Sequence, residues 1–253
     1  MVAERTQELG LAQEKMVRQE KLAVLGQLAG SVGHELRNPL GVISNSVYYL
    51  NLVLPEINDK VRQYLDMIEN ETRNAARIVG DLLDYARVTT AEQKPVSIAE
   101  IVNKTLEHFH IPSQVELILE LPGDLPLAYA DELHMQQVLG NLVTNGYQAI
   151  LEQNTGSSDS DQAGTLTISA QRSKLSNGQP AVCIQVKDTG AGIRPEDMQK
   201  IFDPLFSTKA QGIGLGLAVS KKLAEANGGQ IEVATRLGEG STFSLFIPTG
   251  AGE

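Results

Sequence analysis

The first third of the chain carries a helical pattern of apolar positions. Between residues 4 and 54, apolar side chains recur at steps of three or four, the spacing of one face of an α-helix. The stripe consists of Leu22, Leu25, Leu28, Val32, Leu36, Leu40, Ile43, Val47 and Leu50. Pro39 falls inside it and predicts a kink, because proline removes a backbone donor and clashes with the preceding turn. Pro55 with Asn58 and Asp59 then predicts a turn.

A second helix is predicted over about residues 57–90, with two heptad seams. One seam contains Val61, Ile68, Ala75 and Leu82, and the other contains Leu65, Thr72, Val79 and Ala86. Sustained heptads indicate a coiled-coil-like partner helix. Two antiparallel helices bury little by themselves, so we predict a homodimer in which two hairpins form a four-helix bundle. The alternative is a monomer in which the hairpin packs on the rest of the chain.

The pattern changes at Lys94-Pro95, so the chain divides near residue 92. Ser97-x-x-Glu100 is a capping box that begins a helix reaching about His110. Further helices are predicted at 131–152 and 213–226. Alternating or β-branched segments predict strands at 114–120, 127–129, 165–171, 181–187, 230–234 and 241–247. Interleaved strands and helices predict an α+β fold overall, in which the helical hairpin is followed by a mixed sheet covered by helices.

Composition narrows the function classes. The chain has 21 Lys and Arg against 31 Asp and Glu, a formal net charge of −10, which argues against nucleic-acid binding and against attachment to an acidic membrane. The N-terminus is charged and does not resemble a signal peptide. The longest uncharged run, 38–55, is too polar for a membrane span, so no membrane contact is expected of this segment. One cysteine, Cys183, excludes an internal disulfide and fits a reducing cytoplasm.

His34 is the first candidate for chemistry. Val32 and Leu36 are expected to face the bundle core, so His34 between them points outward, and Gly33 leaves room for a large partner. A neutral imidazole can act as a nucleophile near neutral pH. Glu35 beside it could hold or accept the ring proton, and Asn38 lies one turn further on the same face. The alternative is an inert surface histidine.

Asn141 and Asn145 are spaced i, i+4 on the helix predicted at 131–152, so their amides share one face. Two neutral oxygen ligands suit Mg²⁺ whose other partners are phosphates and water. A solvated helix face is the alternative.

Glycine-rich segments form the third group of candidates. Asp188 with Gly190 and Gly192 directly follows a strand, where an aspartate could bond a base amine and glycines let a ligand approach the backbone. A second set opens a helix, where bare N–H groups favour phosphate; it consists of Gly212, Gly214 and Gly216. This set follows no strand, which excludes the dinucleotide-binding fingerprint. The segment 201–209 between them could form a short lid with Lys209 near phosphates, and the alternatives are plain turns and loops.

Taken in order, these motifs resemble the sensor histidine kinases of two-component systems over about residues 20–248. His34 to Leu40 resembles the family's H box, and Asn141 to Asn145 its N box. Phe202 to Lys209 resembles the F box, and the two glycine sets resemble the glycine boxes on either side of it. Gly238 to Phe243 resembles the last hairpin.

The resemblance implies a dimerisation and histidine phosphotransfer hairpin at 22–92, followed by a Bergerat-type ATP-binding domain, an α/β sandwich with a mixed sheet, at 93–253. Residues 1–21 would be a signalling coiled-coil helix that continues from an upstream sensor domain in a longer parent protein. That parent could be anchored in a membrane, with this part in the cytoplasm.

The resemblance also assigns roles. His34 would take the γ-phosphoryl group of ATP, with Glu35 as general base. Asn145, supported by Asn141, would bind Mg²⁺. Asp188 would bond the adenine amine in a pocket shaped by Gly190 and Gly192, while a lid and phosphate cradle would consist of Lys209, Gly212, Gly214 and Gly216. The phosphoryl group would pass to an aspartate on the receiver domain of a response regulator, which Asn38 would help to dephosphorylate by orienting water.

Two departures from the family pattern matter. After Asn145 the chain reads Gly146-Tyr147-Gln148-Ala149, where the family often has alanine and then a lysine-aromatic pair, so one phosphate contact could be weaker. The lid from Asp203 to Gly212 is short. Two other functions stay open. One is a non-catalytic dimeric adaptor derived from a histidine kinase. The other is an ATP-hydrolysing protein of the same nucleotide fold, in which a glutamate stands where this chain has Asn141.

Overall fold

A computed structural model of the chain describes residues 36, 38–54, 58–86, 90–107, 109, 111–154, 164–209 and 214–250. The chain separates into two compact units, Met1–Thr89 and Thr90–Glu253, which we call the helical unit and the sheet unit. The part of the predicted first helix that precedes residue 36 lies outside the described residues. Among the described residues, no helix is both long enough and apolar enough to cross a membrane.

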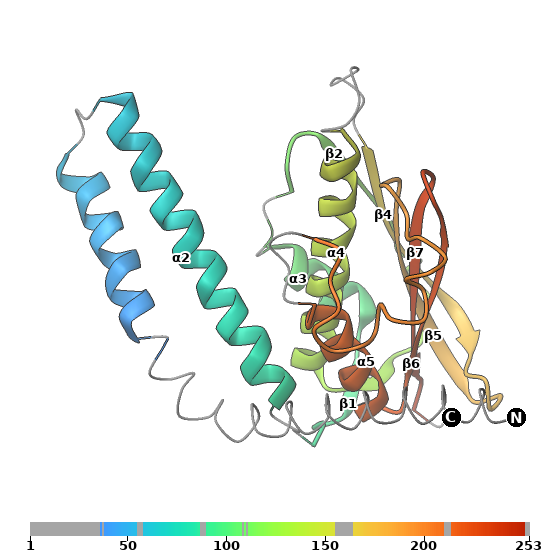
Figure 1. Ribbon diagram of the computed structural model, residues 1–253. Helices are drawn as coiled ribbons and strands as arrows, with labels where there is room; N and C mark the ends of the chain where they lie inside the picture. The colour runs from blue at the N-terminus through green and yellow to red at the C-terminus, as the bar shows by residue number, and fades with distance from the viewer. Residues whose placement is uncertain are drawn as a thin grey trace, which may run out of the picture. The chain divides into compact units, whose positions relative to one another are not determined.

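The helical unit contains a helical segment at 38–53 and the helix α2 (Asp59–Ala86), which lie side by side as a hairpin (Figure 1). Asn58 caps α2, because its Oδ1 accepts the backbone N–H of Val61 at 2.9 Å. The two predicted helices of the hairpin are therefore present in the described residues, and the first ends at residue 53 before the second begins at Asp59.

The two heptad seams of α2 have different surroundings. In the second seam, Leu65, Thr72 and Val79 are all buried. Thr72 satisfies its hydroxyl within the helix by donating to the carbonyl of Ile68 at 2.7 Å. In the first seam, Val61 and Ile68 stay more than 40% exposed. One seam is therefore used inside the hairpin and the other is left on its surface.

Within its described residues, the sheet unit is built on a sheet of five strands in the order β2-β4-β5-β7-β6. Their bounds are β2 (Val115–Glu120), β4 (Gly164–Lys174), β5 (Pro180–Asp188), β6 (Gln230–Arg236) and β7 (Gly240–Pro248). β2 pairs with β4 in parallel and the other pairs are antiparallel, so the sheet is mixed as predicted. A separate antiparallel pair joins β1 (Lys94–Val96) to β3 (Ala128–Ala130). The sequence pattern indicated a break at Lys94-Pro95 and missed β1.

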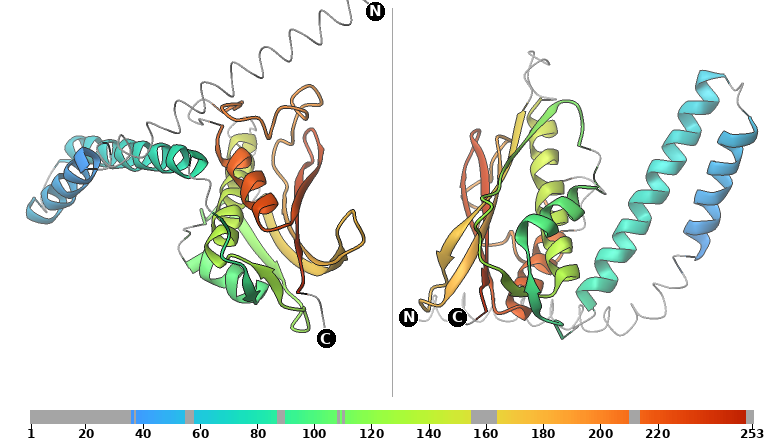
Figure 2. Two further views of the ribbon diagram at one scale, coloured as in Figure 1. Left: turned by 90° about the horizontal axis from the view of Figure 1, so that it is seen from below. Right: turned by 180° about the vertical axis from the view of Figure 1, so that it is seen from behind.

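In the part of this unit that the structure describes, one face of the five-stranded sheet is covered by α3 (Ile98–Glu107), α4 (Glu132–Asn154) and α5 (Gly216–Ala226) (Figures 1 and 2). Ser97 begins α3 as expected, because its Oγ accepts the N–H of Glu100 at 3.4 Å. The core lies between helices and sheet. Its largest fully buried side chains include Met135, Leu139 and Leu142 from α4, and Leu166, Ile168, Ile184 and Leu245 from the sheet. The predicted fold class, a helical hairpin followed by a mixed-sheet α/β domain, is confirmed.

Candidate functional site

Asp188 ends the central strand β5 and is only 3% exposed. Its Oδ1 accepts the backbone N–H of Gly190 at 2.9 Å and of Ser241 at 3.2 Å. Burial raises the pKa of this carboxyl, although the two backbone bonds and the positive charge of Lys209 act to lower it. Because both bonds end on Oδ1, Oδ2 remains for a ligand donor such as an amine. Ser241 belongs to this site and was not among the predicted residues.

The glycines after Asp188 are required by close packing and by backbone conformation. A Cβ on Gly190 would lie 2.5 Å from the backbone carbon of Ala149 in α4. Gly192 has φ +70°, and a Cβ there would collide with the carbonyl of Arg236 at the end of β6. The backbone is held to α4 and to the turn after β6, since Ala191 N–H donates to the carbonyl of Ala149 at 3.4 Å and Gly238 N–H donates to that of Ala191 at 2.8 Å. The loop therefore has one fixed path beside α4.

Asn141 is fixed by the start of α5. Its Nδ2 donates to the carbonyl of Gly216 at 3.1 Å and to Oγ of Ser220 at 3.3 Å. Ser220 is fully buried, and its own hydroxyl donates to the carbonyl of Gly216 at 2.8 Å. A carbonyl accepts and never donates, so the amide nitrogen of Asn141 must be the atom that faces Gly216. This bond tells the two ends of the amide apart, and Oδ1 also lies beside the start of α5, 3.8 Å from where a Cβ on Gly216 would stand.

Asn145 lies one turn after Asn141 and contacts a cation. The Lys209 ammonium donates to Oδ1 of Asn145 at 3.4 Å and to Oε1 of Gln148 at 2.8 Å. The Asn145 amide oxygen therefore already faces a positive charge. Amide oxygens are the kind of ligand that Mg²⁺ accepts beside phosphates and water, so the residues present fit such an ion.

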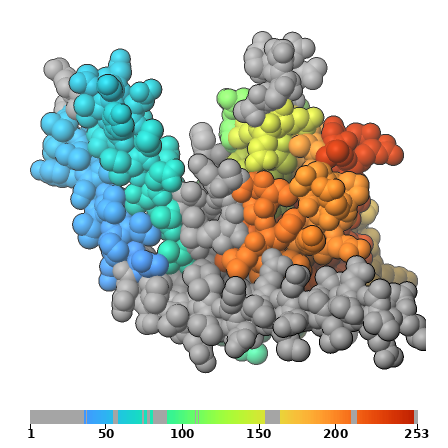
Figure 3. Space-filling view, in the orientation of Figure 1, coloured from blue at the N-terminus to red at the C-terminus, as the bar shows by residue number. Residues whose placement is uncertain are grey.

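Lys209 ends the segment 201–209, which lies on the surface of the sheet unit between β5 and α5 (orange in Figure 3). Ser207 supports its backbone, because Oγ accepts the N–H of Lys209 at 3.1 Å. Leu205 N–H donates to the carbonyl of Gly214 at 3.0 Å, which joins the segment to the residues just before α5. Lys221 of α5 places its ammonium 5.6 Å from the centre of the Phe202 ring, which ties the segment to that helix.

The second glycine set is only partly described. Gly214 has φ +73°, and a Cβ there would collide with the backbone of Phe206. Gly216 has ordinary space around it and contributes its carbonyl to Asn141. The helix predicted to begin at residue 213 begins at Gly216, because Gly214 adopts a conformation that helices exclude. Gly212 lies outside the described residues.

Two family models match the chain. "His Kinase A (phospho-acceptor) domain" matches residues 24–91, and "Histidine kinase-, DNA gyrase B-, and HSP90-like ATPase" matches residues 130–251. The signal transduction histidine-protein kinase AtoS of Escherichia coli K12 is 35% identical over 240 residues, which are 93% of this chain and 37% of AtoS. The sensor histidine kinase ZraS of the same strain is 34% identical over 241 residues, 94% of this chain and 48% of ZraS. The chain belongs to the sensor histidine kinase family. It spans less than half the length of these two relatives.

Solved histidine kinase structures share the fold. The nucleotide-free catalytic domain of the histidine kinase ThkA superposes with a TM-score of 0.51 at 27% identity, over 62% of this chain and 96% of that one. Full-length ShkA, crystallised with AMPPNP, superposes with a TM-score of 0.65 at 23% identity, over 89% of this chain and 47% of that one.

The sheet unit of this histidine kinase family member brings together Asn141 and Asn145 of α4, Lys209, and the Asp188 loop. Gly146 joins the two halves of the site, because a Cβ there would meet Asp188 Cβ at 3.5 Å and the Leu166 side chain at 2.5 Å. An alanine at this position would require the Leu166 side chain to shift. Asn38 belongs to the helical unit and is exposed, while His34 and Glu35 lie outside the described residues.

Sequence reasoning missed two polar side chains of this site. Gln148 follows Asn145 by three residues on the same helix face, a signal that was readable in the sequence. Ser220 lies in α5, and nothing local in the sequence indicated that its hydroxyl would contact Asn141 of α4.

Proposed function

We propose that this chain is an ATP-dependent protein-histidine kinase that phosphorylates its own His34. The observation that carries the proposal is the fixed amide of Asn141 beside Asn145 and the Lys209 ammonium. An ATP-hydrolysing relative would use a carboxylate at residue 141 as the base for water. Here an amide stands at that position, and its nitrogen is already bonded to Gly216 and Ser220. The site is suited to bind nucleotide phosphates, but residue 141 offers no base to activate water. We therefore expect the γ-phosphoryl group to be accepted by a side chain outside this site.

ATP would be recognised at both ends. The adenine amine would donate to Oδ2 of Asp188, whose Oδ1 is held by two backbone N–H groups. The phosphates would lie along the face of α4 that carries Asn141 and Asn145, with Lys209 and Gly214 beside them. Bound there by the amide oxygens of Asn145 and Asn141, Mg²⁺ would supply positive charge that neutralises the phosphate oxygens.

The phosphoryl transfer needs positioning and charge neutralisation more than covalent help. An imidazole nitrogen of His34 would form a bond to the γ-phosphorus as the bond to the β–γ bridging oxygen breaks, releasing ADP. Glu35 would accept the proton that the ring loses. The phosphoryl group would then pass to an aspartate of a response regulator receiver domain. Asn38 would orient water for dephosphorylation of the regulator. It is exposed, as that role requires.

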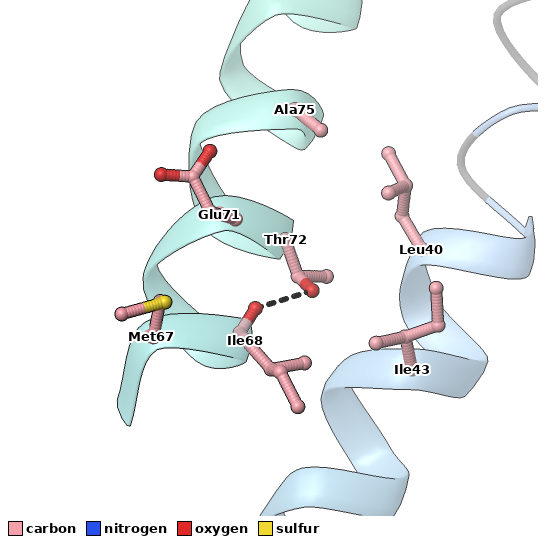
Figure 4. Close-up of a pocket in the computed structure, with 7 residues that line it drawn as sticks. All are labelled: Leu40, Ile43, Met67, Ile68, Glu71, Thr72 and Ala75. Atoms are coloured by element: carbon pink, nitrogen blue, oxygen red, sulfur yellow. Dashed lines mark hydrogen bonds between the residues drawn. The ribbon is translucent and has the colours of Figure 1, made fainter. Parts of the chain in front are cut away.

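The proposed homodimer is supported by the unused seam of α2. An open groove on the hairpin has almost entirely apolar walls (Figure 4), lined by Leu40, Ile43, Met67, Ile68, Glu71, Thr72 and Ala75. Leu40 and Ile43 point across the groove toward α2 (Figure 4). The exposed Ile43, Met67 and Ile68 leave this face uncovered in one chain. A second copy of the hairpin would cover it and complete a four-helix bundle.

Transfer of the phosphoryl group to a response regulator is tested by following a radioactive phosphate from this chain to receiver domains. The chain is labelled with γ-³²P ATP and Mg²⁺ and freed of nucleotide. It is then mixed in turn with each receiver domain of the source genome. We expect label to move within seconds to one receiver as an alkali-labile acyl phosphate. A chain that accepts label but passes it to none of the receivers would contradict the relay. A chain that binds ATP without becoming labelled would favour the non-catalytic adaptor.

A further inference from the structure

The Lys209 ammonium donates to Gln148 of α4 at 2.8 Å, a shorter bond than the one it makes to Asn145 at 3.4 Å. Gln148 follows Asn145 by three residues and Asn141 by seven, so all three side chains lie on one face of the helix. Both Gln148 and Lys209 are half-buried. A hydrogen bond from an ammonium to a carbonyl oxygen in such a place is stronger than a neutral one.

The backbone near Lys209 is fixed independently of Gln148. Ser207 accepts the N–H of Lys209, and Leu205 is bonded to Gly214. Leu205 has φ +64°, which is unusual for a residue with a side chain and which these neighbouring bonds hold in place. The loop thus fixes the base of the lysine, but four flexible methylene groups separate that base from the charge. The contact with Gln148 fixes the tip.

Asn145 cannot serve equally as the anchor. If its Oδ1 binds Mg²⁺, the ammonium is repelled from that oxygen, because two cations compete for one lone-pair region. Gln148 Oε1 is one helical turn further on and can keep its bond. An ammonium has three donors, so Lys209 can bond Gln148 with one and turn another to a phosphate oxygen.

We propose that Gln148 is a positioning residue that holds the Lys209 ammonium beside the phosphates. The family often has a lysine on this helix shortly after the second asparagine. In this chain the positive charge would come instead from Lys209 of the segment 201–209. The inference rests on the proposed function, since it concerns the same nucleotide site. A cationic side chain at residue 148 would repel Lys209, so the neutral amide and the lysine act as a pair.

The test is a double-mutant cycle with Gln148→Met and Lys209→Met in the full chain, measured by titration with ATP in Mg²⁺, ATP in excess EDTA, and adenosine. Methionine keeps the length of glutamine and removes its acceptor. Gln136→Met is the matched control, a half-buried glutamine of the same helix whose amide bonds Glu132. Thermal unfolding of each variant separates lost binding from lost folding.

We expect Gln148→Met to weaken ATP binding about five- to tenfold in Mg²⁺, and less in EDTA, where Asn145 keeps its own bond to the ammonium. Adenosine binding and the Gln136→Met control should stay within twofold of wild type. In the Lys209→Met background the same change should have no further effect. Additive losses in the cycle, or equal losses for adenosine and ATP, would overturn the positioning role while leaving the kinase function intact. A wild-type chain that fails to bind ATP would overturn both.

Discussion

The Asn141 amide donates from Nδ2 to the backbone carbonyl of Gly216 at 3.1 Å, joining the middle of α4 to the first residue of α5. The bond has a direction that chemistry enforces, because only a donor can satisfy that carbonyl. A buried serine completes the contact from the other side. This relationship fixes the face that α4 presents to a nucleotide and distinguishes the site from one that carries a carboxylate there.

Asn141→Asp tests that bond directly. A carboxylate cannot donate to Gly216 and would place negative charge against its carbonyl oxygen, so the chain should lose about 1–3 kcal/mol of unfolding free energy. ATP binding should weaken at least tenfold. Urea unfolding and nucleotide titration measure the two effects. Asn103→Asp adds the same charge at an exposed position of α3 and should change neither. Equal behaviour of the two variants would show that the Asn141 contact is unimportant.

Ser220→Ala should loosen Asn141 without adding charge. We expect ATP binding to weaken about threefold, because Asn141 keeps its bond to Gly216 and loses the second one. Thr105→Val is the control, since Thr105 is also buried and donates its hydroxyl to the carbonyl four residues earlier, at 2.8 Å to Ile101. If both variants lower the melting temperature and only Ser220→Ala weakens ATP binding, the hydroxyl orients Asn141. Equal ATP affinities would argue for a purely structural serine.

Asp188→Asn should raise the stability of the fold and weaken ATP binding. Burial raises the pKa of Asp188, so its charged form is penalised in the folded state. Asp188 therefore favours folding most at low pH, where its carboxyl is protonated. This contribution to the free energy of unfolding is lost as pH rises through the raised pKa. Asparagine removes the penalty while its Oδ1 still accepts both backbone bonds. At pH 7.5 the variant should melt a few degrees higher, since about 1 kcal/mol corresponds to about 2–4 °C in a chain of this size.

The same variant should bind ATP at least a hundredfold more weakly, because an amide nitrogen in place of Oδ2 cannot accept from the adenine amine. In the wild type, ATP affinity should fall as pH drops through the raised pKa of Asp188. Differential scanning fluorimetry and titration at several pH values measure both effects. A less stable variant that still binds ATP would contradict the assignment of Asp188.

Ile68→Lys should separate the dimer. Ile68 is 45% exposed in one chain and lines the open groove, so a charge there would be buried against a second copy. We expect the sedimentation coefficient to fall to that of a monomer while the helical circular dichroism signal is retained. Gln63→Lys places the same charge at an exposed position outside the groove and should stay dimeric. A monomeric wild type, or a dimeric Ile68→Lys chain, would contradict the proposed interface.

The sequence was informative where local chemistry decides the structure. The turn at Asn58, the cap at Ser97 and the mixed character of the sheet followed from short patterns. The heptads of α2 predicted two seams but not which one the hairpin would use. That choice depends on how the segment 38–53 packs, and Val47 of this segment is buried together with Leu65, Thr72 and Val79.

Contacts between distant segments could not be read from the sequence. The order β2-β4-β5-β7-β6 places β7 between β5 and β6, so the last strand supplies Ser241 to Asp188 from 53 residues away. Likewise, Gln148 gains its role from Lys209, 61 residues later. Such partners are chosen by the packing of helices and sheet, which local periodicity does not encode.

The central claim is that His34 receives the γ-phosphoryl group of ATP, and phosphate transfer to the purified chain tests it most directly. Wild type and His34→Gln are incubated with Mg²⁺ and either γ-³²P or α-³²P ATP, and the denatured chains are treated with acid and with alkali. The account predicts label from the γ position only, stable in alkali, lost in acid and absent from His34→Gln. Label that survives acid, or that remains on His34→Gln, would contradict it.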